Sequence, residues 1–107
     1  MKTIPVQITV QHFNDCPNWR TLTERLEQVI ESTGADAVVR LQLVNTPEAA
    51  EEHSFRGSPT ILIDGIDPFA NPDAPVGLAC RVFHTPDGPA GSPTVEQLAK
   101  ALAERTN

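Results

Sequence analysis

The sequence has few cysteines, few basic side chains and no long apolar run. Its two cysteines stand far apart, at positions 16 and 80, and so they form no disulfide framework of the kind that holds small secreted domains together. The chain carries 8 Lys and Arg against 14 Asp and Glu, a net charge of -6. An acidic chain repels phosphate backbones, so we expect no nucleic-acid partner. No stretch of about 20 apolar residues is present, so we expect no membrane span.

The first residues also lack the positive region, apolar stretch and small-residue cleavage site of a secretory signal. Residues 1–5 lead directly into a strand-like pattern, and we therefore expect a cytoplasmic protein. The length of 107 residues, of which 39% are hydrophobic, suits one domain over residues 1–107 with one modest core. The sequence leaves the oligomeric state open.

The spacing of apolar residues changes along the first half of the chain. Strict alternation over residues 4–11 predicts a half-covered strand. Spacings of three and four between Trp19 and Ile30 then predict a helix, with Gly34 just past its end. Residues 37–44 alternate again and predict a second strand. A strand–helix–strand unit of this length predicts parallel strands joined by a right-handed crossover.

The following residues predict a second helix and a third strand. Thr46 and Pro47 suit the N-cap and the first turn of a short helix that runs to His53. The continuously apolar run 60–63 predicts a central strand that is covered on both faces. Residues 66–78 contain three prolines and predict an ordered loop, inserted before the last strand.

Residues 79–84 are the candidate for that last strand. A C-terminal helix follows, with Ser92 as its N-cap and Pro93 at its first position. The predicted order is therefore β-α-β-α-β-loop-β-α, which is a mixed α/β fold.

Cys16 is the candidate nucleophile. It follows the first predicted strand and stands at the N-cap of the first helix, with Pro17 at the first helical position. Free N–H groups and the helix dipole favour negative charge at such a place. Since the thiolate is the reactive species, we expect Cys16 to be the more reactive thiol. The alternative is a capping or buried cysteine without reactivity.

Three separated segments, in this order of elements, resemble the thioredoxin-like fold superfamily. They are Asp15-Cys16-Pro17-Asn18-Trp19, Ser58-Pro59-Thr60, and Gly91-Ser92 before the last helix. The chain is also similar to a group of poorly characterised bacterial thioredoxin-like proteins, which share Asp-Cys-Pro-Asn, Gly-Ser-Pro-Thr and Gly-Leu-Ala-Cys-Arg segments. The resemblance implies a thioredoxin-like βαβαββα sandwich with the proline-rich insertion at residues 66–78, and a role in thiol–disulfide exchange.

The resemblance also implies a site. It implies a cis bond before Pro59, and a substrate groove formed by Trp19, Ser58, Pro59, Thr60, Gly91 and Ser92. Dithiol members of the superfamily carry a second cysteine three positions after the first, where this chain has Trp19. The implied reaction is therefore a monothiol, glutaredoxin-like exchange at Cys16 without a bound cofactor. A protein thiol or disulfide, or a small thiol such as glutathione, is the implied partner or co-substrate.

Several alternatives stay open. A non-catalytic thioredoxin-like binding module would recognise a peptide or a small thiol without turnover, so enzymatic activity is undecided. Trp19 suits core packing, or an aromatic wall beside the thiol. We favour Cys80 as a buried core residue of the last strand, since free cysteine is often buried. It would instead be the resolving thiol if the proline-rich loop folded back toward Cys16.

A metal site is the last alternative. His12 precedes Cys16 by four positions and His84 follows Cys80 by four, and two histidines with two cysteines would form a tetrahedral zinc set. These spacings fall on a strand-to-helix turn and along a strand, rather than in tight ligand knuckles. We therefore expect no metal site.

Overall fold

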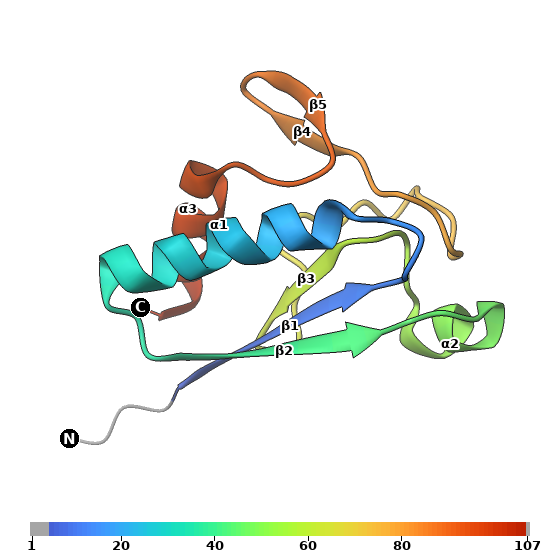
Figure 1. Ribbon diagram of the computed structural model, residues 1–107, viewed down its shortest axis with the longest axis horizontal. Coiled ribbons are helices and arrows are strands. Elements are labelled where there is room, and N and C mark those ends of the chain that lie inside the picture. The colour runs from blue at the N-terminus through green and yellow to red at the C-terminus, as the bar shows by residue number, and fades with distance from the viewer. Residues whose placement is uncertain (1–4, 107) are drawn as a thin grey trace.

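The computed structural model describes residues 5–106, and it has a mixed α/β fold (Figure 1). Its elements, in chain order, are β1 (Val6–His12), α1 (Asn18–Thr33), β2 (Ala37–Leu43), α2 (Pro47–His53), β3 (Thr60–Ile63), β4 (Phe83–Thr85), β5 (Gly88–Ala90) and α3 (Val95–Thr106). Ile4, which the sequence places in the first strand, lies outside the described residues. Within residues 5–106, none of the helices has the length and apolarity that crossing a membrane requires.

The main sheet has three strands in the order β2-β1-β3. β1 pairs in parallel with β2, as predicted, and antiparallel with β3, so that Ile8 lies between Val39 and Ile63. The prediction of a central, doubly covered β3 is wrong. β3 is an edge strand of this sheet, and Leu62 is partly exposed. The segment predicted as the last strand does not join its outer edge, where Ile63 instead forms an isolated antiparallel bridge with Ile66.

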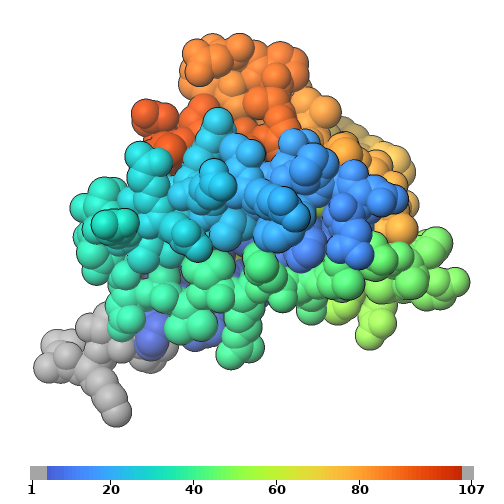
Figure 2. All heavy atoms as spheres, viewed as in Figure 1, coloured from blue at the N-terminus to red at the C-terminus, as the bar shows by residue number. Residues whose placement is uncertain are grey.

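That segment forms a separate hairpin instead. Only residues 83 and 84 of the predicted strand 79–84 belong to a strand, β4, which pairs with β5 rather than with β3. Gly88, which follows the connecting residues 86–87, has a φ of +105°, a conformation that glycine adopts without strain. Closing this short loop costs less chain entropy than pairing with a distant strand. The hairpin stands out from the body of the molecule (Figures 1 and 2).

α1 and α3 cover the same face of the sheet (Figure 1). The main core between these helices and the sheet consists of Val6, Ile8, Val10, Leu22, Leu26, Val29, Ile61, Ile63, Leu98, Ala101 and Leu102. The predicted alternation of β1 and the predicted apolar faces of both long helices are thereby confirmed. Leu41 and Leu43 remain 51% and 52% exposed, because β2 is the other edge strand.

The C-terminal end of α1 and the N-terminal end of α2 agree with the sequence. Gly34 ends α1 in the left-handed conformation, with a φ of +70°. The hydroxyl of Thr46 accepts a hydrogen bond from the Ala49 backbone N–H at 3.1 Å and caps α2. Both predictions are confirmed. Such ends can be predicted from the sequence because a cap depends only on groups within a few residues of it.

The predicted cap of the last helix is wrong. α3 begins at Val95, two residues after Pro93. Thr94 and Gln97 form a reciprocal capping box, in which the Gln97 N–H donates to the Thr94 hydroxyl at 3.1 Å and the Thr94 N–H donates to the Gln97 side chain at 2.9 Å. This box satisfies two N–H groups at once, whereas Ser92 alone would satisfy one.

Candidate functional site

Cys16 lies in the turn between β1 and α1. Its N–H donates to the Phe13 carbonyl at 3.3 Å, and Pro17 takes the N-cap of α1. The expected N-cap position of Cys16 is therefore wrong by one residue. The side chain is completely buried, and its thiol donates a hydrogen bond to the Ser58 carbonyl at 3.4 Å. Cys16 thus faces the segment that precedes β3.

That segment is compact and buried. The bond between Ser58 and Pro59 is cis, and Ser58, Pro59 and Thr60 are all buried. The Ser58 hydroxyl accepts a hydrogen bond from the Phe13 N–H at 3.4 Å, and the Thr60 hydroxyl donates to the Gly57 carbonyl at 2.7 Å. Side chains and backbone together therefore hold the turn against the Cys16 loop.

Residues 79–81, here called the strap, lie across Ser58. The Ser58 N–H donates to the Ala79 carbonyl at 2.7 Å, and the Arg81 N–H donates to the Ser58 carbonyl at 2.8 Å. These two bonds form an isolated parallel bridge between Ser58 and Cys80. The chain itself therefore occupies the backbone groups of Ser58 that the expected substrate groove would offer to a partner.

The strap brings the two cysteines together. The Sγ atoms of Cys16 and Cys80 are 2.7 Å apart, although the residues are 64 positions apart in the chain. Cys80 is exposed and lies outside any strand, so its favoured interpretation as a buried strand residue is wrong. The hydrogen bond that Cys80 donates to Cys16 raises the pKa of the Cys80 thiol, and partial burial and the charge of a Cys16 thiolate add to this effect.

Trp19 is partly buried and packs against the main core. Its ring stacks on that of His12, with centroids 4.5 Å apart and an interplanar angle of 27°. Burial lowers the pKa of His12, since it disfavours the charged imidazolium. The His12 Nδ1 atom is buried and has no hydrogen-bond partner among residues 5–106.

Gly91 and Ser92 do not form an open ligand site. A Cβ added at Gly91 would overlap the side-chain amide of Asn18. Ser92 is buried, and its hydroxyl donates to the Pro93 carbonyl at 3.0 Å. The Asn18 side chain and local packing therefore fill the space that the expected groove would need here.

The open space lies on the other side of Cys80. A hollow of about 960 Å³ is formed by the proline-rich loop, β3 and the segment after the strap. Cys80, Asp67 and Arg81 are among the residues that line it, together with Thr60 and Leu62 of β3. Gly91 and Ser92 do not line it. The exposed sulfur of the pair is thus the one that an incoming molecule can reach.

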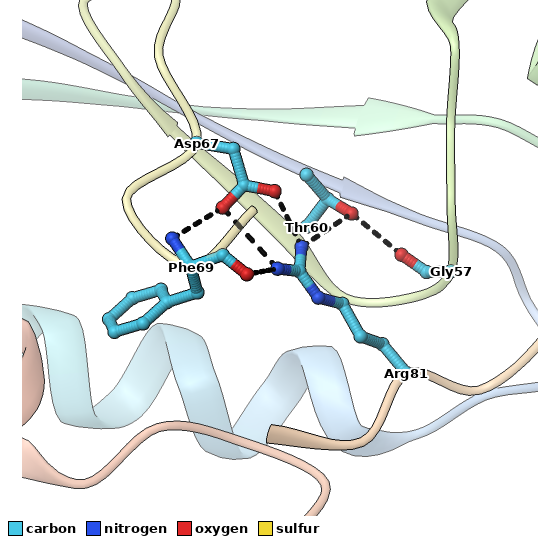
Figure 3. Close-up of polar contacts among 5 residues, drawn as sticks. All are labelled: Gly57, Thr60, Asp67, Phe69 and Arg81. Atoms are coloured by element: carbon cyan, nitrogen blue, oxygen red, sulfur yellow. Dashed lines mark hydrogen bonds and ion pairs between the residues drawn. The ribbon is translucent and has the colours of Figure 1, made fainter. Parts of the chain in front are cut away.

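Sequence reasoning missed Arg81 and Asp67. The two side chains form an ion pair, with Nη1 of Arg81 2.7 Å from Oδ2 of Asp67 (Figure 3). Arg81 follows Cys80 directly, and this adjacency was the one available signal. No local pattern pairs it with a carboxylate fourteen positions earlier in the chain.

The four side chains considered above as an alternative zinc set do not all gather at one place. Among residues 5–106, no group of three or more His, Cys, Asp or Glu side chains is arranged to hold a metal ion. His12 lies against Trp19, while His84 is an exposed residue of β4.

No protein-family model matches the chain, and no curated protein matches it either.

Proposed function

We propose that this protein is a thiol–disulfide oxidoreductase whose redox centre is the pair Cys16–Cys80. The observation that carries the proposal is the 2.7 Å separation of the two Sγ atoms. A disulfide has an S–S length of about 2.05 Å, so only a small further approach is needed for the bond. The cysteines come from segments far apart in sequence, and the hydrogen-bonded bridge at Ser58 supports their alignment.

The proposal includes a thioredoxin-like fold. In its support, β1 lies between parallel β2 and antiparallel β3, and Cys16 lies in the turn that follows β1. Pro59 immediately precedes β3, beside the residue that accepts the Cys16 hydrogen bond. The departure from the expected sandwich is the last strand, because β4 pairs only with β5 within the described residues.

Exposure assigns different roles to the two sulfurs. Cys80 is exposed and Cys16 is completely buried, so a partner reaches Cys80 first. We therefore replace the expected monothiol exchange at Cys16 by an exchange that begins at Cys80 and is resolved by Cys16. The Cys80 residue faces solvent on one side and Cys16 on the other. This arrangement suits an attack by the Cys16 sulfur from one side while the sulfur of the partner leaves on the other.

The reaction proceeds in two steps that balance. The Cys80 thiol loses its proton, and its thiolate attacks one sulfur of a partner disulfide. A Cys80–partner disulfide forms, the partner bond breaks, and the first partner thiolate leaves and takes up a proton. The Cys16 thiol then loses its proton, and its thiolate attacks Sγ of Cys80. The Cys16–Cys80 bond forms, and the second partner thiolate leaves and is protonated. The protein dithiol is oxidised and the partner disulfide is reduced to two thiols.

The experiment oxidises the reduced protein with glutathione disulfide and identifies the products by mass spectrometry of unreduced peptides. We expect an internal Cys16–Cys80 disulfide in the wild type. In Cys16→Ser, we expect a stable glutathione adduct on Cys80, because the resolving thiol is missing. In Cys80→Ser, we expect little adduct, because Cys16 remains covered.

Turnover is measured with a peptide disulfide as substrate and dithiothreitol as reductant. Both cysteine variants should fall to the rate of the reaction without protein. A wild type that forms neither the internal disulfide nor an adduct would contradict the proposal. That result would favour the alternative, a non-catalytic module that binds a peptide or a small thiol.

A further inference from the structure

The strap has little apolar packing to hold it in place. Ala79 and Cys80 are exposed, and the backbone pairing of the strap in the bridge involves the single residue Ser58. Two backbone hydrogen bonds to one residue restrain only the backbone of the strap at that point, and each makes only a modest net contribution to stability. Another contact is therefore needed to keep Cys80 over Cys16.

The side chain of Arg81 supplies that contact. Its two terminal nitrogens bind both carboxylate oxygens of Asp67, at 2.7 and 3.4 Å, and one of them also donates to the Phe69 carbonyl. The same guanidinium donates to the Thr60 hydroxyl at 3.4 Å and lies 4.6 Å from the ring centroid of Phe83. Figure 3 shows these polar partners around the end of the side chain.

The surroundings of this ion pair strengthen it and fix its orientation. The Arg81 side chain is 9% exposed and that of Asp67 is 20% exposed, so water and salt screen the pair less than they screen a surface pair. A two-pronged contact between guanidinium and carboxylate also fixes orientation. The Asp67 carboxylate is itself held, since it accepts the Phe69 N–H at 2.8 Å.

The proline-rich loop supplies the acceptors that Arg81 binds. Asp67 and the Phe69 carbonyl both belong to residues 66–78, and Phe69 packs against the main core. A second arginine, Arg56, donates to the carbonyls of Pro72 and Ala74. The loop is thus tied to the body of the protein, and it offers Arg81 a fixed acceptor.

We propose that the Arg81–Asp67 ion pair is a positioning device, which holds Cys80 against Cys16 and thereby sets the dithiol–disulfide equilibrium of the pair. This inference rests on the proposed redox function. The physical reason is effective concentration, because a thiol held beside its partner forms the bond without a further loss of chain freedom. Without the ion pair the strap samples more positions, and the disulfide becomes easier to reduce.

The experiment compares Asp67→Asn, Arg81→Gln and Arg81→Lys with the wild type. Each protein is equilibrated in glutathione buffers of graded redox potential, quenched with an alkylating reagent, and assayed for its oxidised fraction. We expect the equilibrium constant for disulfide formation to fall about tenfold in Asp67→Asn and Arg81→Gln, which corresponds to a reduction potential about 30 mV less negative. The equilibrium constant should fall less in Arg81→Lys, because lysine keeps the positive charge but loses the two-pronged contact with the carboxylate.

The matched control is Arg25→Gln, which removes an arginine that donates to the Pro93 carbonyl, away from the proline-rich loop and the strap. It should leave the equilibrium constant unchanged. Denaturant unfolding of the oxidised and reduced forms of each variant provides the second readout. If Arg81 and Asp67 only stabilise the fold, both forms lose equal stability and the equilibrium constant does not move, and that result would overturn the inference.

Failure of the proposed function gives a different result. In that case, the wild type itself forms no internal disulfide at any redox potential, and both proposals are overturned. A normal wild-type equilibrium with unchanged Asp67→Asn and Arg81→Gln variants overturns the positioning role alone.

Discussion

The Sγ atoms of Cys16 and Cys80 lie 2.7 Å apart, although one side chain is completely buried and the other is exposed. Local sequence patterns favour the opposite assignment, with a reactive Cys16 beside a helix and a buried Cys80 in a strand. The strap reverses this assignment, because it covers Cys16 and leaves Cys80 exposed to solvent.

The first prediction concerns the order of alkylation. In the reduced protein, we expect maleimide to label Cys80 well before Cys16, because a buried thiol reacts only after local opening. Peptide mapping at short reaction times measures the order. In Cys80→Ala, Cys16 should stay slow, since the backbone bonds of Ala79 and Arg81 to Ser58 remain. Faster labelling of Cys16 than of Cys80 in the wild type would contradict the closed strap.

The second prediction concerns the pH at which Cys80 reacts. The hydrogen bond to Cys16 raises the pKa of Cys80, so its alkylation rate should reach half of its maximum at a higher pH than that of an ordinary thiol. Cys16→Ala removes the acceptor, and the midpoint should move to lower pH. Cys16→Ser keeps an acceptor and should shift less. An unchanged midpoint in Cys16→Ala would show that the contact does not control Cys80.

The third prediction concerns Gly57, where the strap leaves little room for a side chain. A Cβ at this position would lie 3.0 Å from the Arg81 Cβ and 3.2 Å from the Ala79 carbonyl oxygen, and the φ of +129° is strained for other residues. Gly57→Ala should lower the unfolding free energy by about 1–3 kcal/mol and should speed the labelling of Cys16. Denaturant unfolding and the maleimide assay measure the two effects.

Gly34→Ala is the control for that variant. Gly34 also has a positive φ, of +70°, but a Cβ there meets no atom within 4 Å. It should lower stability through backbone strain without changing the labelling of Cys16. Equal labelling in both variants would mean that the close approach at Gly57 does not hold the strap.

The fourth prediction concerns His12, whose pKa is lowered by burial. Its ordinary pKa is 6.5, so above this pH both folded and unfolded chains carry it neutral and it adds no pH dependence. Below this pH the unfolded chain takes up the proton first, and the unfolding free energy should fall. His12→Phe keeps a ring against Trp19 and should flatten this part of the pH profile, measured by denaturant unfolding.

The control for that measurement is His53→Gln, which removes an exposed imidazole at the end of α2. We expect it to keep the acid slope of the wild type. An acid slope in His12→Phe as steep as that of the wild type would show that His12 is not its source.

The short-range features of the fold could be predicted because their causes are local. The alternation of Val6, Ile8 and Val10, the left-handed Gly34 and the Thr46 cap each depend on neighbours within a few positions. The cap of α3 was missed for a related reason. Ser92 and Thr94 are both residue types that suit an N-cap. Thr94 takes the position because the Gln97 side chain accepts a hydrogen bond from the Thr94 N–H, which completes a capping box.

The site could be predicted only in part. Cys16, Ser58 and Pro59 stand together in the structure, and their segments were singled out from the sequence. Cys80 was considered as a resolving thiol, but it was favoured as a buried residue of a strand that begins only at Phe83. Arg81 was not singled out, because its one signal is that it follows Cys80. Gly91 and Ser92 were singled out as well, but Asn18 and local packing close that region.

By itself, the sequence determined which segments of the first half form helices and strands, which faces are apolar and which residues bear thiols. These properties follow from spacing and from contacts along a short stretch of chain. Only the tertiary structure decided that Cys80 meets Cys16, that Arg81 meets Asp67 and that Ser58 pairs with the strap. The reason is that these contacts join residues separated by loops, whose path depends on the packing of the whole domain and on no pattern within any single segment.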